Sequence, residues 1–371
     1  MFNTNKKKGG FSKIQKPSKS PSLRSPLGIA IALSAGILTF SACSDLSQES
    51  VVQPQAIEQS RTFELPQQPQ GDPIVLTVPK AEATFEDEEG GENARRRGQA
   101  SARARFNIQL EFLTPVTAQQ EAVFQEAAAR WERIIIKDVE NIAGPIPSAL
   151  GPFFIVPPGE QVDDIIIEVV LQNIDGPGNI LGAAGPNFIR FSDNLPLSGF
   201  MFFDTSDLAV LEAFNLFDEV IIHEMGHVLG IGTVWDLTFD GVNFERQLIA
   251  GTPENPFFTG RFGNIHWRAA GGENALPIEG AAAGPGTAFS HWSEDILDNE
   301  LMTGFLNLGV NPLSRITAGS LRDLGYGVAL VGDPYSVRDQ IVARLNTEAG
   351  EGIHIAEREI LYKPKGYIKV E

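Results

Sequence analysis

The chain has 371 residues, enough for one or two domains with a large core, and the composition of an ordinary globular protein. It carries 29 Lys and Arg against 47 Asp and Glu, which gives a formal net charge of −18 at pH 7. So acidic a chain is repelled by phosphates, which argues against nucleic acid as a partner. With Cys43 as its one cysteine, the chain has no internal disulfide.

Residues 1–42 have the pattern of a secretory signal. They contain seven Lys or Arg and no Asp or Glu, and the apolar run PLGIAIALSAGILTF at 26–40 is short for a membrane span. SAC follows, which resembles the lipobox of bacterial lipoproteins, although Phe40 stands where leucine is usual. We therefore predict a lipoprotein-type signal peptide and lipidation of Cys43. The protein would then be exported and anchored by lipid to a bacterial membrane, at the cell surface or the periplasmic face. An uncut N-terminal anchor and an ordinary signal that leaves the protein secreted are the alternatives.

Residues 43–105 are predicted to be a disordered linker or a pro-segment. They are rich in Gln, Pro, Ser and Glu, and an acidic cluster at 85–92 runs into an arginine-rich one at 94–105. Such a composition buries little apolar surface. One strand is indicated, at PIVLTV (73–78). The arginine cluster is either a processing site or a solvated charge run.

Ordered structure is predicted from Phe106 onwards. FNIQLEFL alternates apolar and polar residues, as a strand does, and the segment after it has helical spacing. Thr117 and Gln120 are suited to a capping box at the start of that helix. Three further segments follow: a buried strand VDDIIIEVVLQNI (162–174), a glycine-rich loop GPGNILGAAGP (176–186), and a strand SGFMFFD (198–204). This order predicts an α+β fold.

Helical periodicity then continues into the stretch HEMGHVLGIGT at 223–233. Positions four apart share a helix face, so His223 and His227 can direct two imidazoles at one ion. Glu224 lies beside them, where a water on that ion would need a base, and Gly230 lets the chain turn away. A catalytic zinc takes three protein ligands and keeps one open position. The third ligand has several candidates: His266, His291, His354 or a downstream glutamate.

The rest of the chain is loop-rich up to the segment TAFSHWSEDILDNELMTGF (287–305). SRITAGSLRDLGY (314–326) predicts a short helix that is capped by Ser or Thr and ends at Gly325. The last 40 or so residues are predicted to form a final helix or a pair of strands, and the sequence does not predict where in the fold they lie.

The motif HExxHxxG at 223–230 resembles that of the metzincin metallopeptidases. Most of these place the third histidine three residues after the glycine, where this chain has Thr233. The pair SHW and ELMTGF resembles instead the leishmanolysin branch, in which a long insertion precedes the third histidine and a methionine turn follows it. The insertion here would run from Ile231 to Ser290. FQEAAARWERII, GFMFFD and TAGSLRDLGY match as well, so the resemblance covers roughly residues 106–330.

The resemblance implies a metzincin-like α+β domain with a twisted mixed sheet, an active-site helix carrying HExxH, and a loop-rich C-terminal subdomain. It implies that Zn²⁺ is bound by His223, His227 and His291. Met302 would lie beneath the site as an apolar floor without binding zinc. Glu224 would act as the general base that takes a proton from water and passes it to the leaving amine.

The implied function is a zinc endopeptidase that acts on proteins or peptides. Its substrate would lie as an added strand along a sheet edge, for which SGFMFFD (198–204) is the candidate. Leishmanolysin-like proteins often restrain the zinc with a pro-segment cysteine, but lipidation accounts for Cys43. Inhibition by residues 44–105 would therefore need an acidic side chain or simple blockage.

Two other functions remain open. One is a non-enzymatic surface lipoprotein that binds a partner through a peptidase-like fold, and the other is a zinc hydrolase with a non-protein substrate. Several acidic residues lack the strict spacing of a calcium loop and are predicted to be solvated or capping groups: Asp204, Asp207, Asp295 and Asp298.

The predicted domain organisation has four parts. They are the signal peptide 1–42, the linker or pro-segment 43–105, the metallopeptidase domain 106–332 with subdomains 106–230 and 231–332, and a C-terminal tail 333–371 of uncertain structure.

Overall fold

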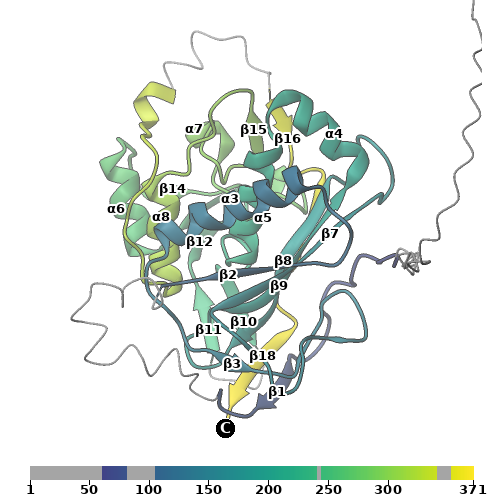
Figure 1. Cartoon of the computed structure of the whole chain (residues 1–371). Helices are drawn as coiled ribbons and strands as arrows, with labels where there is room; N and C mark the ends of the chain where they lie inside the picture. The colour runs from purple at the N-terminus through teal and green to yellow at the C-terminus, as the bar shows by residue number, and fades with distance from the viewer. Residues whose placement is uncertain (1–60, 82–104, 240–243, 341–351) are drawn as a thin grey trace, which may run out of the picture. The chain divides into compact units, whose positions relative to one another are not determined.

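The computed structural model describes residues 61–81, 105–239, 244–340 and 352–371 (Figure 1). All described residues lie in one unit, Glu58–Glu371. The predicted signal peptide and the predicted lipidation site Cys43 lie outside the described residues. Within the described ranges, no helix is both long and apolar enough to span a membrane.

The centre of the unit is a seven-stranded sheet with the order β1-β18-β8-β9-β7-β2, and β17 also pairs with β8. β2, β7 and β9 are mutually parallel, whereas β8 runs antiparallel to β9 and parallel to β17 and β18. The strands are β1 (Ile74–Val78), β2 (Ile108–Phe112), β7 (Ile165–Gln172), β8 (Gly182–Arg190), β9 (Pro196–Asp204), β17 (Glu359–Leu361) and β18 (Gly366–Val370). The predicted α+β class with a mixed sheet is confirmed.

Helices and small hairpins surround this sheet. The helices are α3 (Ala118–Ile134), α4 (Thr205–Phe214), α5 (Phe217–Val228), α6 (Arg261–Ala269), α7 (Glu294–Leu297) and α8 (Arg315–Leu324), with a short 3₁₀ helix at Ala281–Ala283. The hairpins on the N-terminal side pair β3 (Ile142–Ala143) with β6 (Gln161–Val162) and β4 (Ile146–Pro147) with β5 (Phe154–Val156). The remaining strands are β10 (Asp236–Phe239), β11 (Phe244–Gln247), β12 (Ile249–Thr252), β13 (Asn255–Phe258), β14 (Leu276–Pro277), β15 (Phe305–Asn307) and β16 (Gly352–His354).

Strand β7 is buried on both of its faces. Its alternate residues from Ile165 to Leu171 belong to the main core, which includes the buried residues of α3 and α5. Ile166 and Val170 point the other way, into two smaller apolar clusters that the β3–β6 segment helps to form. A strand covered on both faces needs apolar residues at nearly every position, which is why this sequence does not alternate.

Helices α3 and α5 pack against each other on the sheet (Figure 1). The predicted capping box of α3 is confirmed: Thr117 Oγ1 accepts from Gln120 N at 3.2 Å, and Gln120 Oε1 accepts from Thr117 N at 3.0 Å. Trp131 is fully buried, and its Nε1 donates to the carbonyl of Ile222 at 3.0 Å. This bond fixes the helix that carries the HExxH motif against α3.

The helical periodicity that leads into the motif is carried by two helices. α4 ends at Asn215, whose left-handed φ of 55° breaks the helix before α5 begins. At the other end of the domain, the predicted helix α8 is confirmed. Ser314 caps it by accepting from Ile316 N at 3.1 Å, and Gly325, with φ 119°, ends it.

Two predictions about the sheet are wrong. The second half of the glycine-rich segment, from Gly182, is strand β8 and not loop, because a hairpin with β9 supplies its hydrogen bonds. SGFMFFD forms part of β9, which lies between β8 and β7 and so is no edge. β8 pairs with β9 on one side and with the C-terminal strands β17 and β18 on the other. Without β17 and β18, β8 would be the edge strand of the sheet.

Segments from both ends of the described chain join the sheet. β1 lies at the predicted strand 73–78, within the predicted linker, and pairs in parallel with β18 (Figure 1). The C-terminal tail, which was not placed from sequence, contributes β17 and β18 to this sheet, and its strand β16 pairs with β15.

Candidate metal centre

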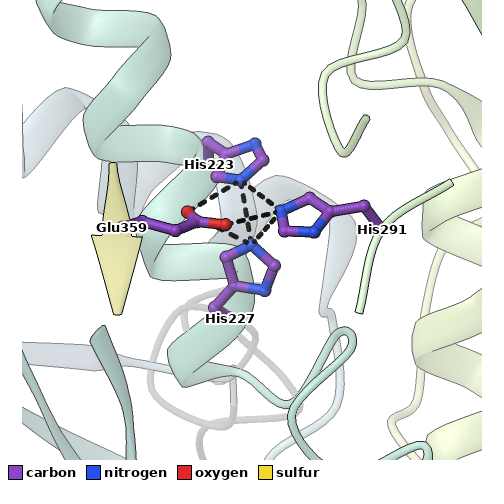
Figure 2. A group of neighbouring side chains, drawn as sticks. All are labelled: His223, His227, His291 and Glu359. Carbon is purple, nitrogen blue, oxygen red and sulfur yellow. Dashed lines mark hydrogen bonds and ion pairs between the residues drawn. The ribbon is translucent and has the colours of Figure 1, made fainter. Parts of the chain in front are cut away.

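Three buried histidines meet at one point (Figure 2). His223 and His227 project from the same face of α5, and His291 approaches from the segment that precedes α7. The Nε2 atoms are 2.9 Å apart for His223 and His227, 3.1 Å for His227 and His291, and 3.2 Å for His223 and His291. The structure thus brings together the three histidines that the resemblance nominated.

Hydrogen bonds on the far side of the rings fix the tautomers of His223 and His227. His223 Nδ1 lies 2.7 Å from the carbonyl of Leu301, and His227 Nδ1 lies 2.8 Å from that of Ile231. His291 Nδ1 is 3.0 Å from Ser290 Oγ. Because a carbonyl only accepts, Nδ1 of His223 and His227 carries the proton, and Nε2 presents a lone pair to the centre.

These donors suit a small cation. Lone pairs of buried imidazoles that face one another at about 3 Å repel unless something positive lies between them. Burial, and then the neighbouring His223, lower the pKa of His227 well below its usual value, so this ring is neutral, as a metal ligand must be. Tetrahedral zinc with bonds of about 2.0–2.1 Å places its ligands roughly 3.3 Å apart, close to the observed spacing.

Glu224 lies next to the histidines on α5 and is fully buried. Neither of its carboxyl oxygens makes a hydrogen bond of normal geometry with the described residues. Burial, and then the negative charge of Glu359, raise the pKa of Glu224 well above its usual value. A buried carboxyl with unused acceptors and a raised pKa is equipped to exchange a proton with a small molecule beside it.

A fourth donor, which the sequence analysis missed, is Glu359 on β17. Figure 2 shows its carboxylate directed at the three rings, with Oε1 2.9 Å from His291 Nε2 and Oε2 3.6 Å from His223 Nε2. The distance from Oε2 to His227 Nε2 is 4.0 Å. Three lone pairs and an anion together form a complete tetrahedral donor set.

Met302 lies beneath this centre and is fully buried. A Cβ added at Gly226, between the two helical histidines, would lie 2.9 Å from Met302 Sδ and 3.0 Å from the Trp131 ring. The backbone carbonyl of Met302 accepts from Trp292 N at 3.0 Å, one residue after His291. The Met302 side chain therefore packs against α5, which carries His223 and His227. Its backbone carbonyl holds the segment that carries His291.

Glu300 holds this methionine turn in place. It is fully buried and accepts hydrogen bonds from Met302 N at 2.8 Å, Ser314 Oγ at 2.7 Å and Thr317 Oγ1 at 2.6 Å. Burial raises its pKa although these bonds lower it. The network ties the turn to the start of α8.

The exit of α5 is tied to the third histidine by close backbone packing. Gly232 has φ 74°, and a Cβ there would lie 2.1 Å from the carbonyl oxygen of Ser290. Thr233, which occupies the place of the third histidine in the short metzincin motif, donates from Oγ1 to the carbonyl of His227 at 2.7 Å. Leu229 is held in turn by Tyr326, whose hydroxyl donates to its carbonyl at 3.1 Å.

Other candidate residues lie away from the site. His266 is on α6, and His354 stacks on Phe305 with ring centroids 3.9 Å apart. Among the described residues, neither belongs to the group that surrounds the metal position. Asp204 caps α4 by accepting from Ser206 N at 2.7 Å, as predicted, although it is buried and not solvated. Asp207 is buried as well and pairs with Arg358 of the tail.

Comparison with known proteins agrees with this arrangement. Residues 154–331 match the model of the peptidase M8 family, leishmanolysin, and this range includes both halves of the histidine cluster and the methionine turn. No curated protein matches the chain. The match over residues 154–331 therefore confirms the resemblance to a leishmanolysin-like metallopeptidase that the motifs indicated.

Proposed function

We propose that the protein is a zinc-dependent endopeptidase with a metzincin-type active site. The observation that carries this proposal is the convergence of three buried histidine Nε2 atoms beside the buried carboxyl of Glu224. His223, His227 and His291 would hold Zn²⁺. When bound, zinc makes water more acidic and polarises a peptide carbonyl.

The residues of the chain supply the proton transfers. Glu224 takes a proton from the attacking water and gives it to the leaving amine. Leu301 and Ile231 accept from His223 and His227 through their carbonyls, which keeps both rings aligned and their Nε2 lone pairs free. Met302 provides the floor and forms no part of the reaction.

The substrate is proposed to be an extended protein or peptide segment. An extended chain adds to a sheet edge through backbone hydrogen bonds, and such binding depends little on side chains. We propose that the substrate pairs with β8. The C-terminal tail already pairs with this strand through β17, and at that point it reaches the three histidines.

The test compares Glu224→Gln with its parent for zinc content and for cleavage of an unfolded protein. Both chains also carry Glu359→Gln, because the Glu359 carboxylate otherwise stands at the fourth position around the metal. We expect both chains to hold one zinc per molecule and Glu224→Gln to cleave at least about 100-fold more slowly. Zinc in both chains without cleavage in either would favour a partner-binding protein or a non-peptide substrate.

We also propose that the protein is exported and held at a bacterial membrane by lipid on Cys43. The support is the sequence alone: a basic start, a short apolar run and the small residues before the cysteine. Mass spectrometry of the N-terminal peptide from membrane-extracted protein should show a lipid-sized increment. An unmodified thiol on Cys43 in that material would contradict the proposal.

A further inference from the structure

The C-terminal tail, residues 352–371, covers the edge of the sheet next to the metal centre. β17 pairs in parallel with β8 through Glu359, Ile360 and Leu361, and β18 continues along the same strand. Tyr362 N donates to the carbonyl of Ala184 at 2.9 Å. The tail therefore uses the backbone groups of β8 that an added peptide strand would need.

The same strand brings its one carboxylate to the metal position (Figure 2). The side chain of Glu359 is fully buried, and its Oε1 atom lies 2.9 Å from His291 Nε2. A catalytic zinc has three protein ligands and keeps its fourth position for water or substrate, whereas a site with four protein ligands is closed. With the tail in place, the centre has the donor set of a closed site.

Close packing shows that the tail fits this position along its length. A Cβ at Gly185 of β8 would lie 2.2 Å from the carbonyl oxygen of Tyr362. A Cβ at Gly286, five residues before His291, would lie 2.3 Å from the carbonyl oxygen of Ala356. Glycine at both positions lets the tail backbone approach where any side chain would keep it away.

Contacts outside the site hold the tail down. Arg358 pairs with Asp207 at the start of α4, and its Nε donates to the carbonyl of Asn179 at 3.1 Å. On the other side, Gln68 Nε2 donates to the carbonyl of Leu361 at 2.8 Å, and the Tyr362 hydroxyl donates to that of Pro66 at 2.6 Å. The segment before β1 thus covers the tail and clamps it onto the sheet.

The tail also forms one wall of a cavity of about 430 Å³ beside the centre. Gly232 and Thr233 at the exit of α5 and Ser290, next to His291, line the cavity as well. Leu361 and Tyr362 close the cavity on the side of β8. A peptide that lay along β8 in place of the tail could direct a side chain into this space, whose volume is typical of ligand pockets.

We propose that residues 352–371 are an autoinhibitory segment that keeps the peptidase latent, with Glu359 as a fourth metal ligand and β17 in the place of the substrate strand. This inference rests on the proposed peptidase function. It assigns the acidic blocking group to the C-terminal tail and not to the pro-segment at 44–105. The peptidase becomes active when the tail leaves β8.

The experiment measures access to the metal without relying on catalysis. Cobalt(II) replaces zinc in the full chain, because zinc has no visible absorption, and acetohydroxamate is titrated as a small chelator that needs an open coordination position. Glu359→Gln is compared with the parent. Glu357→Gln is the matched control, since its side chain lies two residues away on the same tail and is 67% exposed. Arg358→Gln loosens the tail without touching the centre.

We expect acetohydroxamate to bind Glu359→Gln at least tenfold more tightly than the parent or Glu357→Gln, with Arg358→Gln in between. Equal binding to Glu359→Gln and the parent would overturn the inference, because Glu359 would then leave the metal open. Cleavage of an unfolded protein is measured on the same samples and should appear with Glu359→Gln and not with the parent. If chelator binding improves but no variant cleaves, and a chain that combines Glu359→Gln with Arg358→Gln to loosen β17 does not cleave either, the peptidase function fails and the capping of the metal by Glu359 stands. A parent chain as active as Glu359→Gln refutes latency while the peptidase function stands.

Discussion

Replacing Gly232 with alanine tests how tightly the exit of α5 is coupled to the third histidine. Gly232 has φ 74°, where an L-residue costs about 1–2 kcal/mol, and its new Cβ would lie 2.1 Å from the Ser290 carbonyl oxygen. Relieving that backbone clash costs about 1–3 kcal/mol more, as overpacking does. The free energy of unfolding should therefore fall by about 2–5 kcal/mol.

Gly271→Ala is the matched control. Gly271 has a similar positive φ of 96°, but a Cβ there would have no heavy atom within 4 Å. It should lose only the conformational part, about 1–2 kcal/mol. The loss of chain entropy in the unfolded state is the same for both variants and cancels in the comparison. The difference between the two, about 1–3 kcal/mol, isolates the contact with Ser290.

Urea unfolding with a chelator present measures both variants without the contribution of metal binding. Zinc affinity is then measured by competition with a chromophoric chelator. Since Ser290 precedes His291 and contacts its ring, Gly232→Ala should weaken zinc binding by about 10–100-fold, as the loss of a supporting hydrogen bond does. Gly271→Ala should bind zinc like the parent. Equal losses of stability and equal zinc affinity in the two variants would refute the coupling.

Three further outcomes are expected. His291→Ala should lose zinc while His266→Ala keeps it, as metal analysis after dialysis will show; equal retention would exclude His291 as a ligand. Met302→Ala should lower the free energy of unfolding by about 2–5 kcal/mol, because the buried side chain leaves a cavity, yet retain zinc; loss of zinc as complete as for His291→Ala would contradict a purely structural role. Burial raises the pKa of Glu168 from 4.5 to about 7, so the folded state holds a proton there that the unfolded state releases. The protonated Glu168 therefore stabilises the folded state below pH 4.5. This stabilisation is lost as the pH rises to about 7, which lowers the free energy of unfolding by up to about 3 kcal/mol. Glu168→Gln should flatten the unfolding free energy over this range, and an unchanged pH profile would argue against the raised pKa.

The part of the active site that sequence alone predicted is the local part. His223 and His227 share a helix face because they are four residues apart, and Glu224 follows from its place between them. The caps of α3 and α8 were predictable for the same reason, since each depends on side chains within one helical turn. The third histidine was nominated by resemblance to a family, because several histidines satisfied the chemistry equally well.

Tertiary structure alone decided the rest. Glu359 lies in the run IHIAEREILY, where a charged residue reads as solvated, and nothing local indicates that its strand pairs with β8 and turns the carboxylate inward. The first part of β8, residues 182–186, was predicted as a loop because its glycines favour turns, whereas Gly185 permits close approach of the tail backbone. The sheet edge and the fourth donor both depend on which distant strands meet. Sequence periodicity determines which face of an element is buried, but not the partner against which it is buried.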